Sequence, residues 1–534
     1  MSYFMPKLTA LSLLLLLLNG CNNHTDQYPP NALNDTYMIN ENTPLTANAA
    51  DNDTPGSSGA NHWYTLTDPL HGSVTMDENG SFSYIPDTNY YGTDSFLYAI
   101  SDEFGQSDNA TVTLNIKPVL FRIKVKTDNQ GFSSDVEFQV AVLDDGYNYD
   151  IDCNNDGKYE STGENEDYTC EYDTPGEYTI AIRGIFPRFY SGYDTDKILS
   201  VESWGTQVWK SFENAFFNCT NLILNAPDKP NLSQVTNMNS MFYGAAAFNQ
   251  PIGDWNVSNV TSMMSTFQNA TAFNQPIGDW NVSNVTIMDG MFLKAAAFNQ
   301  PIGDWNVSNV TSSQFMFAEA TAFNQPLEKW NLSSLTNSRG MFYHATVFNQ
   351  PIGDWNVSNV TDMVGMFYSA TAFNQPIGNW DVSSVESMTV MFKNATAFNQ
   401  PIENWDVSSV RYMKAMFENA TTFNQALGNW NISNVIDMVG MFTNATTFNQ
   451  PIGNWDVSSV QYMDDLFNNA TAFNQALENW DVSSVEYMNR MFYNASAFSD
   501  HDLSGWNVDN VLDHTDFCTG WGTGNTPPSD WTCD

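Results

Sequence analysis

Thiol groups are the side chains with the most distinctive chemistry in this sequence, and the chain carries six of them, at Cys21, Cys153, Cys170, Cys219, Cys518 and Cys533. Cys153 with Cys170, and Cys518 with Cys533, are close pairs that suit local disulfide bonds in an oxidising compartment. Neither pair has the CxxC spacing of a metal site. Cys219 is left over, and we expect it to be a buried thiol.

Catalytic side chains form no recognisable motif. The six histidines are scattered, at His24, His62, His71, His344, His501 and His514, and none lies in an HExxH sequence. GxSxG, P-loop and dinucleotide-binding glycine patterns do not occur in the sequence. Carboxylates such as Asp254 and Asp279 recur too regularly to be a single acid–base pair. We therefore expect no catalytic residue, no bound metal ion, no cofactor and no enzymatic activity.

The first 21 residues carry the signals of export. Lys7 supplies a short positive region, and Leu8 to Leu18 form an apolar stretch of signal-peptide length, too short to span a bilayer. Residues 1–20 are therefore predicted to be a signal peptide. The sequence from Leu18 to Cys21 resembles the lipobox of bacterial lipoproteins, in which the cysteine becomes the acylated N-terminus. The resemblance implies lipid attachment at Cys21, and the alternative is a secreted protein with an incidental cysteine.

The residue after Cys21 bears on the destination. Asn22 is not the aspartate that resembles an inner-membrane retention signal, so the resemblance implies a lipid anchor in the outer membrane or at the cell surface. Residues 21–31 lack apolar periodicity and contain Pro29-Pro30, which predicts an extended linker.

The composition is that of a folded and strongly acidic chain. Asp and Glu total 60 against 18 Lys and Arg, which gives a formal net charge of -42 over 534 residues. Charge of this sign repels nucleic acid, so we expect no nucleic-acid partner. Hydrophobic residues make up 42% of the chain, which is enough for packed cores in several domains.

Residues 32–118 alternate short apolar runs with Gly, Asp and Asn turns, which is typical of an antiparallel β-sandwich. NDTYMINENTPLTANAADNDTPG and HGSVTMDENGSFSYIPDTNYYGTDSFLYAISD resemble the bacterial cadherin-like, Ig-like repeat. In such modules carboxylates placed like Glu41, Asp51, Asp53 and Asp102 bind calcium, so calcium stays an alternative cofactor here. TPGSSGA replaces the usual DPDGD segment, which favours a turn-forming role for these residues.

Residues 119–190 also read as strands, in FRIKVKT, VEFQVAVL and GEYTIAIRGIF. YNYDIDCNNDGKYE together with YTCEYDTPGEYTIAIRG resembles a PKD-type β-sandwich, in which Cys153 and Cys170 would bridge neighbouring strands. Asp152, Asn154 and Asp156 imitate the first half of a calcium loop. Gly163 stands where that loop requires Glu, so a tight turn is the preferred interpretation.

A repeat of 25 residues, with the sequence FNQPIGDWNVSNVT and close variants, dominates residues 198–534. A period this short is typical of a solenoid. Ile252, Trp255, Val257 and Val260 have the spacing of a leucine-rich-repeat core, and the WxV alternation predicts a short strand. The following apolar residues recur at intervals of four and three and predict a short helix. We expect the Trp and Met columns to be core, and the Asn column that begins at Asn249 to form a ladder of buried amides.

The outward half of the predicted strands forms the candidate binding face. Its members are polar or acidic residues next to the Trp and Val columns: Asp254, Asn256, Ser258, Asp279, Asn281, Asp304, Asn306, Asp354, Asn356, Asn379, Asp381, Asn404, Asp406, Asn454, Asp456, Asn479 and Asp481. Lys329 is a rare basic residue among them. Such a face suits a protein partner, a basic or sugar ligand, or bridging calcium, and plain solubility is the alternative.

The array resembles the leucine-rich-repeat surface-protein family named after BspA, whose members carry FNQPIGNWDVSNVT coils and are often lipoproteins. The end of the chain, with Cys518 and Cys533, looks like a disulfide-closed cap. The resemblance implies two all-β sandwiches followed by a leucine-rich-repeat-type solenoid with a strand and a short helix per coil. It also implies a non-enzymatic adhesion module that binds an extracellular protein or glycan. A self-associating envelope protein and a carbohydrate-binding surface protein are the alternatives.

Overall fold

The computed structural model describes residues 28–57, 59–88, 90–529 and 531–533. The predicted signal peptide, Cys21 and the first residues of the predicted linker lie outside the described residues. Among the described residues, no helix has both the length and the apolar character needed to cross a membrane. The chain divides into two compact units, with the boundary between Val119 and Leu120.

The first unit consists of two facing sheets. One has the strand order β1-β7-β6-β3 and the other β2-β5-β4, and only the β1–β7 pairing is parallel. The strands are β1 (Asp35–Asn40), β2 (Leu45–Asn48), β3 (His62–Thr65), β4 (Gly72–Met76), β5 (Ser81–Pro86), β6 (Gly92–Ser101) and β7 (Ser107–Lys117). Alternate residues of β5 and β7 are buried, which is the period of a half-buried strand. Phe82, Tyr84, Phe96 and Tyr98 form the centre of this core.

The second unit begins with a six-stranded sheet of order β11-β10-β13-β8-β14-β15 and a separate β9–β12 pair. Its strands are β8 (Phe121–Lys126), β9 (Glu137–Val140), β10 (Asn148–Asp152), β11 (Ser161–Glu164), β12 (Tyr168–Glu171), β13 (Glu177–Ile185), β14 (Ile198–Ser203) and β15 (Ile223–Leu224). A disulfide joins Cys153, which follows β10, to Cys170 in β12, with the Cα atoms 5.7 Å apart. β14 pairs antiparallel with β8 and parallel with β15, so this sheet continues directly into the repeats.

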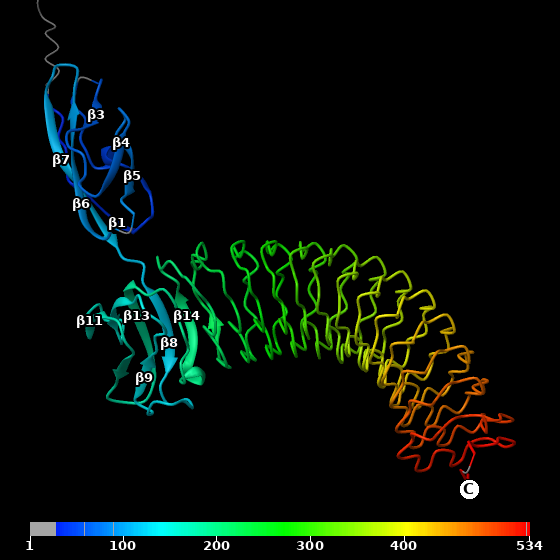
Figure 1. The fold of residues 1–534 in the computed structure, drawn as a ribbon. Helices are drawn as coiled ribbons and strands as arrows, with labels where there is room; N and C mark the ends of the chain where they lie inside the picture. The colour runs from blue at the N-terminus through cyan, green and yellow to red at the C-terminus, as the bar shows by residue number, and fades with distance from the viewer. Residues whose placement is uncertain (1–27, 58, 89, 530, 534) are drawn as a thin grey trace, which may run out of the picture. The chain divides into compact units, whose positions relative to one another are not determined.

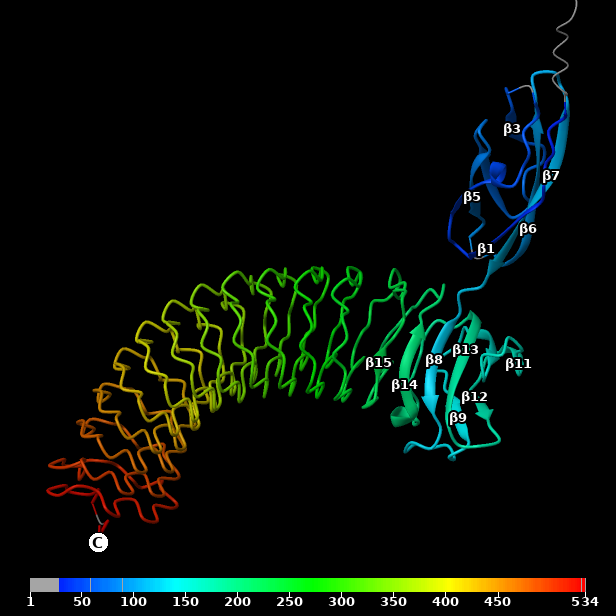
Figure 2. The same ribbon diagram turned by 180° about the vertical axis from the view of Figure 1, so that it is seen from behind.

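Successive coils of the repeat lie side by side in Figures 1 and 2. Neighbouring coils are joined by one parallel β-bridge each, in an unbroken series from Asn237↔Ser262 to Tyr487↔Asp513. Each coil buries its Ile, Trp, Val, Met, Phe and Ala columns almost completely. One hydrophobic core therefore runs from Phe121 in β8 to Cys518 near the end of the chain.

The predicted strand and helix of each coil are both wrong. Trp255 lies in a bend and Val257 in an irregular segment, and the β-bridge falls at Ser262 instead. Where the helix was expected, the N–H of Met263 donates to Ile287 O in the next coil and the N–H of Phe267 to Met291 O. Between them, the N–H of Ser265 donates to Asp289 O of the next coil, and that of Thr266 to Met263 O three residues back. The N–H of Met264 donates to Asn239 Oδ1 of the preceding coil, so this segment does not follow the i-to-i−4 pattern of an α-helix.

Left-handed residues explain how this turn-and-bridge path differs from a helix. Ser265 and Asn269 have φ angles of 55° and 59°, and equivalent positions recur in the other coils. The N–H of each of these two residues donates to the neighbouring coil, from Ser265 to Asp289 O and from Asn269 to Leu293 O. The leucine-rich-repeat fold class is therefore contradicted: the described chain is nearly all strand, bridge and turn, and its helices are the 3-10 turns Ala49–Asp51 and Thr195–Lys197, both outside the repeats.

From Trp280 onward, the indole N–H of each buried tryptophan in the repeats is hydrogen-bonded to the neighbouring coil. The indole Nε1–H of Trp380 donates to Ile352 O, 28 residues back, at 3.0 Å, and the same bond recurs from Trp280 to Trp480. Trp380 lies parallel to Trp355 and Trp405, with ring centroids 6.3 and 6.4 Å apart. The column thus combines apolar packing with a hydrogen bond between coils.

Asparagine forms a second ladder, although its residues are half-buried or exposed and not buried as expected. Asn249 Oδ1 accepts the backbone N–H of Asn274 at 2.9 Å and also a bond from Gln275 Nε2 at 3.0 Å. The extra residue before the last coil is taken up near Asp500, whose φ is 63°, so Trp506 still reaches Leu477 O. The Cys518–Cys533 disulfide closes the last described turns.

Candidate functional site

The candidate binding residues of the repeats lie in turns or irregular segments, and all of them are exposed except Ser258, which is half-buried. Apart from Ser258, they fall into two columns with different local chemistry. The aspartate column contains Asp254, Asp279, Asp304, Asp354, Asn379, Asn404, Asn454 and Asn479, and the capping column contains Asn256, Asn281, Asn306, Asn356, Asp381, Asp406, Asp456 and Asp481. The two columns flank the Trp column, where the expected strand is absent.

The capping column holds its own turns together. Asn256 Oδ1 accepts the N–H of Ser258 at 3.2 Å, and Asp406 Oδ1 accepts the N–H of Ser408 at 3.0 Å. Hydrogen bonds from the side chain and backbone of Ser408 lower the pKa of the Asp406 carboxyl. Asn and Asp exchange freely in this column because both present an oxygen to the same N–H. These side chains have a structural role.

The aspartate column carries ion pairs between coils. Lys229 Nζ lies 2.6 Å from Asp254 Oδ2, and Lys329 Nζ lies 2.7 Å from Asp304 Oδ1. The bond to Asp304 raises the pKa of the Lys329 ammonium group. Lys229 was missed by the sequence analysis, although counting one period back from Asp254 leads to it. Within the described residues, Asp279 makes no ion pair.

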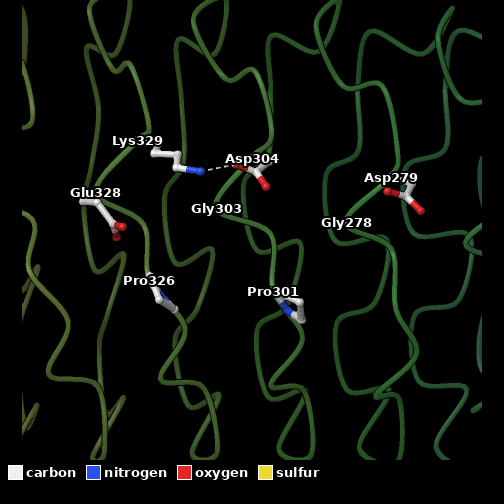
Figure 3. Close-up of a pocket in the computed structure, with 8 residues that line it drawn as sticks. All are labelled: Gly278, Asp279, Pro301, Gly303, Asp304, Pro326, Glu328 and Lys329. Carbon is white, nitrogen blue, oxygen red and sulfur yellow. Dashed lines mark hydrogen bonds and ion pairs between the residues drawn. The ribbon is translucent and has the colours of Figure 1, made fainter.

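A groove runs beside the aspartate column. One pocket of about 400 Å³ is lined by Asp279, Pro301 and Asp304 with their neighbours, and Figure 3 shows Lys329 pointing toward Asp304 while Asp279 stands apart. A second pocket shares Gly278, Asp279 and Pro301 and extends to Pro251. Glycine allows two coils to approach closely beside the groove, because a Cβ on Gly278 would lie 2.6 Å from Pro301 O of the next coil. The sequence analysis did not find this groove.

Three of the four carboxylates considered for calcium in the first unit, Glu41, Asp53 and Asp102, accept hydrogen bonds from other groups. Asp53 accepts hydrogen bonds from Trp63 Nε1 and the Tyr98 hydroxyl, each at 2.8 Å. Asp102 Oδ1 accepts the N–H groups of Phe104 and Gln106, which forms a turn. In the part of the chain that the structure describes, no group of three or more His, Cys, Asp or Glu residues is arranged to hold a metal ion.

Asp35 is the one carboxylate of this region with an unsatisfied atom. It is 8% exposed, and its Oδ2 has no hydrogen-bond partner among the described residues. Burial and the negative charge of Asp53 raise the pKa of Asp35 to about 6. In the second unit the oxygens of Asp152 accept N–H groups from Asp156 and Gly157, so that loop is the expected tight turn. Cys219 is a free thiol, fully buried, and burial raises its pKa.

Known families match both parts of the chain. Residues 210–330, 316–430 and 413–531 match the family described as "Mycoplasma protein of unknown function, DUF285", and together these matches span more than half of the chain. The chain belongs to the DUF285 family. Residues 27–118 match the bacterial cadherin-like domain. No curated protein matches the chain. A cadherin-like domain in front of a DUF285 array supports a bacterial surface repeat protein.

Proposed function

We propose that this chain is a bacterial cell-surface lipoprotein, anchored through Cys21, that acts as a non-enzymatic adhesion module. The DUF285 array binds an extracellular protein, and the β-domains act as spacers between the anchor and the array. The observation that carries the proposal is the groove beside the aspartate column, which has carboxylates that the fold does not use.

The contrast between the two columns supports this assignment. Capping residues such as Asp406 are tied to their own turns, whereas Asp279 is exposed and contributes nothing to the packing. A side chain that the fold does not need, held on a rigid scaffold, is suited to binding. Bonds from coil to coil fix the spacing of these groups before any partner arrives, which reduces the entropic cost of binding.

Cell binding by two matched variants of the whole mature chain tests the proposal. One variant replaces Asp254, Asp279, Asp304 and Asp354 with Asn. The control replaces Asp381, Asp406, Asp456 and Asp481 with Asn, which removes the same charge and introduces a residue that other coils already carry in that column. We expect the first variant to lose binding and the control to retain it. Equal binding by both variants would contradict the assignment.

The anchor needs a separate experiment, because Cys21 lies outside the described residues. Fatty-acid labelling of the wild type and of Cys21→Ser, together with protease treatment of intact cells, tests attachment and display. Labelling that survives the substitution would exclude acylation at Cys21. Protection of the wild type from protease would exclude surface display.

Self-association and sugar binding have weaker support. A second copy would bring two strongly acidic surfaces together, and the formal charge of -42 opposes that contact. The Tyr343 and Tyr368 rings, the most evident sugar platform, stack on each other at 4.6 Å, and Lys393 Nζ lies over Tyr368. Their faces are therefore largely covered. Light scattering across concentrations and a glycan array with and without chelator test these two alternatives.

A further inference from the structure

We propose that the groove receives an extended segment of a partner protein that presents two lysine side chains about six residues apart on one face. Their ammonium groups pair with Asp279 and Asp354, which lie three coils apart. This inference rests on the proposed function and specifies the chemistry of the partner. The protein's own lysines, the shape of the groove and the spacing of the coils each support it.

The chain's own lysines show how the column accepts an ammonium group. The charged positions follow the order Lys229, Asp254, Asp279, Asp304 and Lys329, one per coil. Each lysine pairs with the aspartate of the adjacent coil, with Nζ–Oδ distances of 2.6 Å for Lys229 and 2.7 Å for Lys329. Two aspartates of the column therefore already bind an ammonium group.

Two carboxylates of the same column are left without such a partner. Asp279 lies between the two paired aspartates, and Asp354 lies one coil beyond Lys329. Within the described chain neither makes an ion pair. Asp279 lines the groove described above, and Asp354 lines a further pocket along the same column, together with Pro351 and Pro376. An external ammonium group at either position would repeat the contact that Lys329 makes with Asp304.

The groove suits a primary ammonium group on a slender segment. Its floor consists of glycine and proline backbone, with Pro301 O beside Gly278. An ammonium group has three donors and uses both carboxylate and carbonyl oxygens. Pro276 and Pro301 contribute the apolar surface against which the methylene groups of a lysine pack.

Coil spacing determines how lysines must be placed on the partner. In the tryptophan column beside the aspartate column, the ring centroids of Trp330 and Trp355 are 6.3 Å apart, and so are those of Trp355 and Trp380. Residues on one face of an extended strand are about 6.6 to 6.8 Å apart, because every second side chain points the same way. A strand that runs along the groove therefore brings alternate side chains close to the register of the coils.

Fluorescence anisotropy with a peptide of alternating lysine and glycine tests the inference on the full mature chain. The aspartate-column double variant Asp279→Asn/Asp354→Asn is expected to weaken binding about five- to tenfold, as for two exposed ion pairs. The charge-matched control Asp381→Asn/Asp406→Asn is expected to bind like the wild type.

Removing Lys329, which competes with the peptide for Asp304, should strengthen peptide binding. Lys329→Met releases Asp304 for the peptide and is expected to tighten binding about two- to threefold, the size of one exposed pair. Lys414→Met makes the same change in net charge at another exposed position of the array and is expected to have no such effect. A peptide with its lysines in adjacent pairs, and one with acetylated lysines, should bind more weakly than the alternating peptide.

Several outcomes would overturn the inference. If the two double variants weaken peptide binding equally, the binding depends on net charge alone. No tightening by Lys329→Met contradicts the assigned pairing. If millimolar calcium displaces the peptide from the wild type but has no effect on the Asp279→Asn/Asp354→Asn variant, the column binds a divalent cation instead. If the peptide behaves as expected but cells do not bind, only the proposed function fails. If cell binding requires the aspartate column but peptide binding does not, only this inference fails.

Discussion

The tryptophan ladder allows a quantitative test of how the coils are held together. Trp380→Phe removes the bond from Nε1 to Ile352 O and part of a side chain that is 3% exposed. Ile352 O retains the N–H of Trp355 at 3.2 Å, so the carbonyl is not left unpaired. The lost hydrogen bond costs about 1 kcal/mol, and the smaller ring costs a further 1 to 2 kcal/mol in packing.

The first tryptophan of the series provides the matched control. Trp255 is 6% exposed and packs in the same column, but its indole N–H makes no hydrogen bond among the described residues. Trp255→Phe should therefore show only the packing loss, about 1 to 2 kcal/mol. The difference between the two variants measures the inter-coil hydrogen bond.

Hydrogen exchange followed by mass spectrometry suits this comparison, because a repeat array need not unfold in one step. Exchange of the amides in the coils around Trp380 should speed up by the equivalent of about 2 to 3 kcal/mol. Exchange around Trp255 in its own variant should change less. Equal changes in the two variants, or a smaller one at Trp380, would refute the argument that the indole bond stabilises the stack.

Three further predictions concern strain, pH and the cap. Val390 is β-branched and has a φ of 50°, so Val390→Gly should stabilise the array by about 1 kcal/mol in urea denaturation, and destabilisation would contradict the strain. Because Asp35 has its pKa raised to about 6 in the folded state, ionising it costs stability as pH rises from about 4 to 6. Asp35→Asn should then stabilise the first unit by about 2 kcal/mol at pH 7 but not at pH 4, and a gain independent of pH would exclude this cause. Replacing Cys518 and Cys533 with Ser opens a loop with a sequence separation of 15 and should lower the free energy of unfolding by about 3 kcal/mol. Thermal unfolding measures this loss, and an unchanged melting temperature would show that the cap does not need the disulfide.

The core and the site differ in how far the sequence could predict them. Columns such as Trp255 and Met263 were expected to be buried, and they are, because a strict period places the same residue type at the same depth in every coil. The groove could not be predicted in this way. It lies beside the contact of Gly278 with Pro301 O of the next coil, and that contact depends on how closely two coils stack.

The helix prediction failed for a related reason. Met263, Phe267 and Ala270 are all buried, as an amphipathic helix would require, but their spacing does not specify where the N–H groups donate. The Asn that recurs at the Asn269 position and the Gly that recurs at the Ser265 position, as in Gly290 and Gly340, were the available signal, because these residues tolerate the left-handed conformation. Read together with the period, they indicate a turn and not a helix.

The sequence by itself determined the repeat period and the residues of the core. Each of these is set by residue type and spacing along the chain. Only the tertiary structure decided that the N–H of Met263 bonds to the next coil, that Lys329 reaches Asp304 and that Asp279 is left exposed without an ion pair among the described residues. These outcomes depend on contacts between coils, whose geometry no single coil specifies.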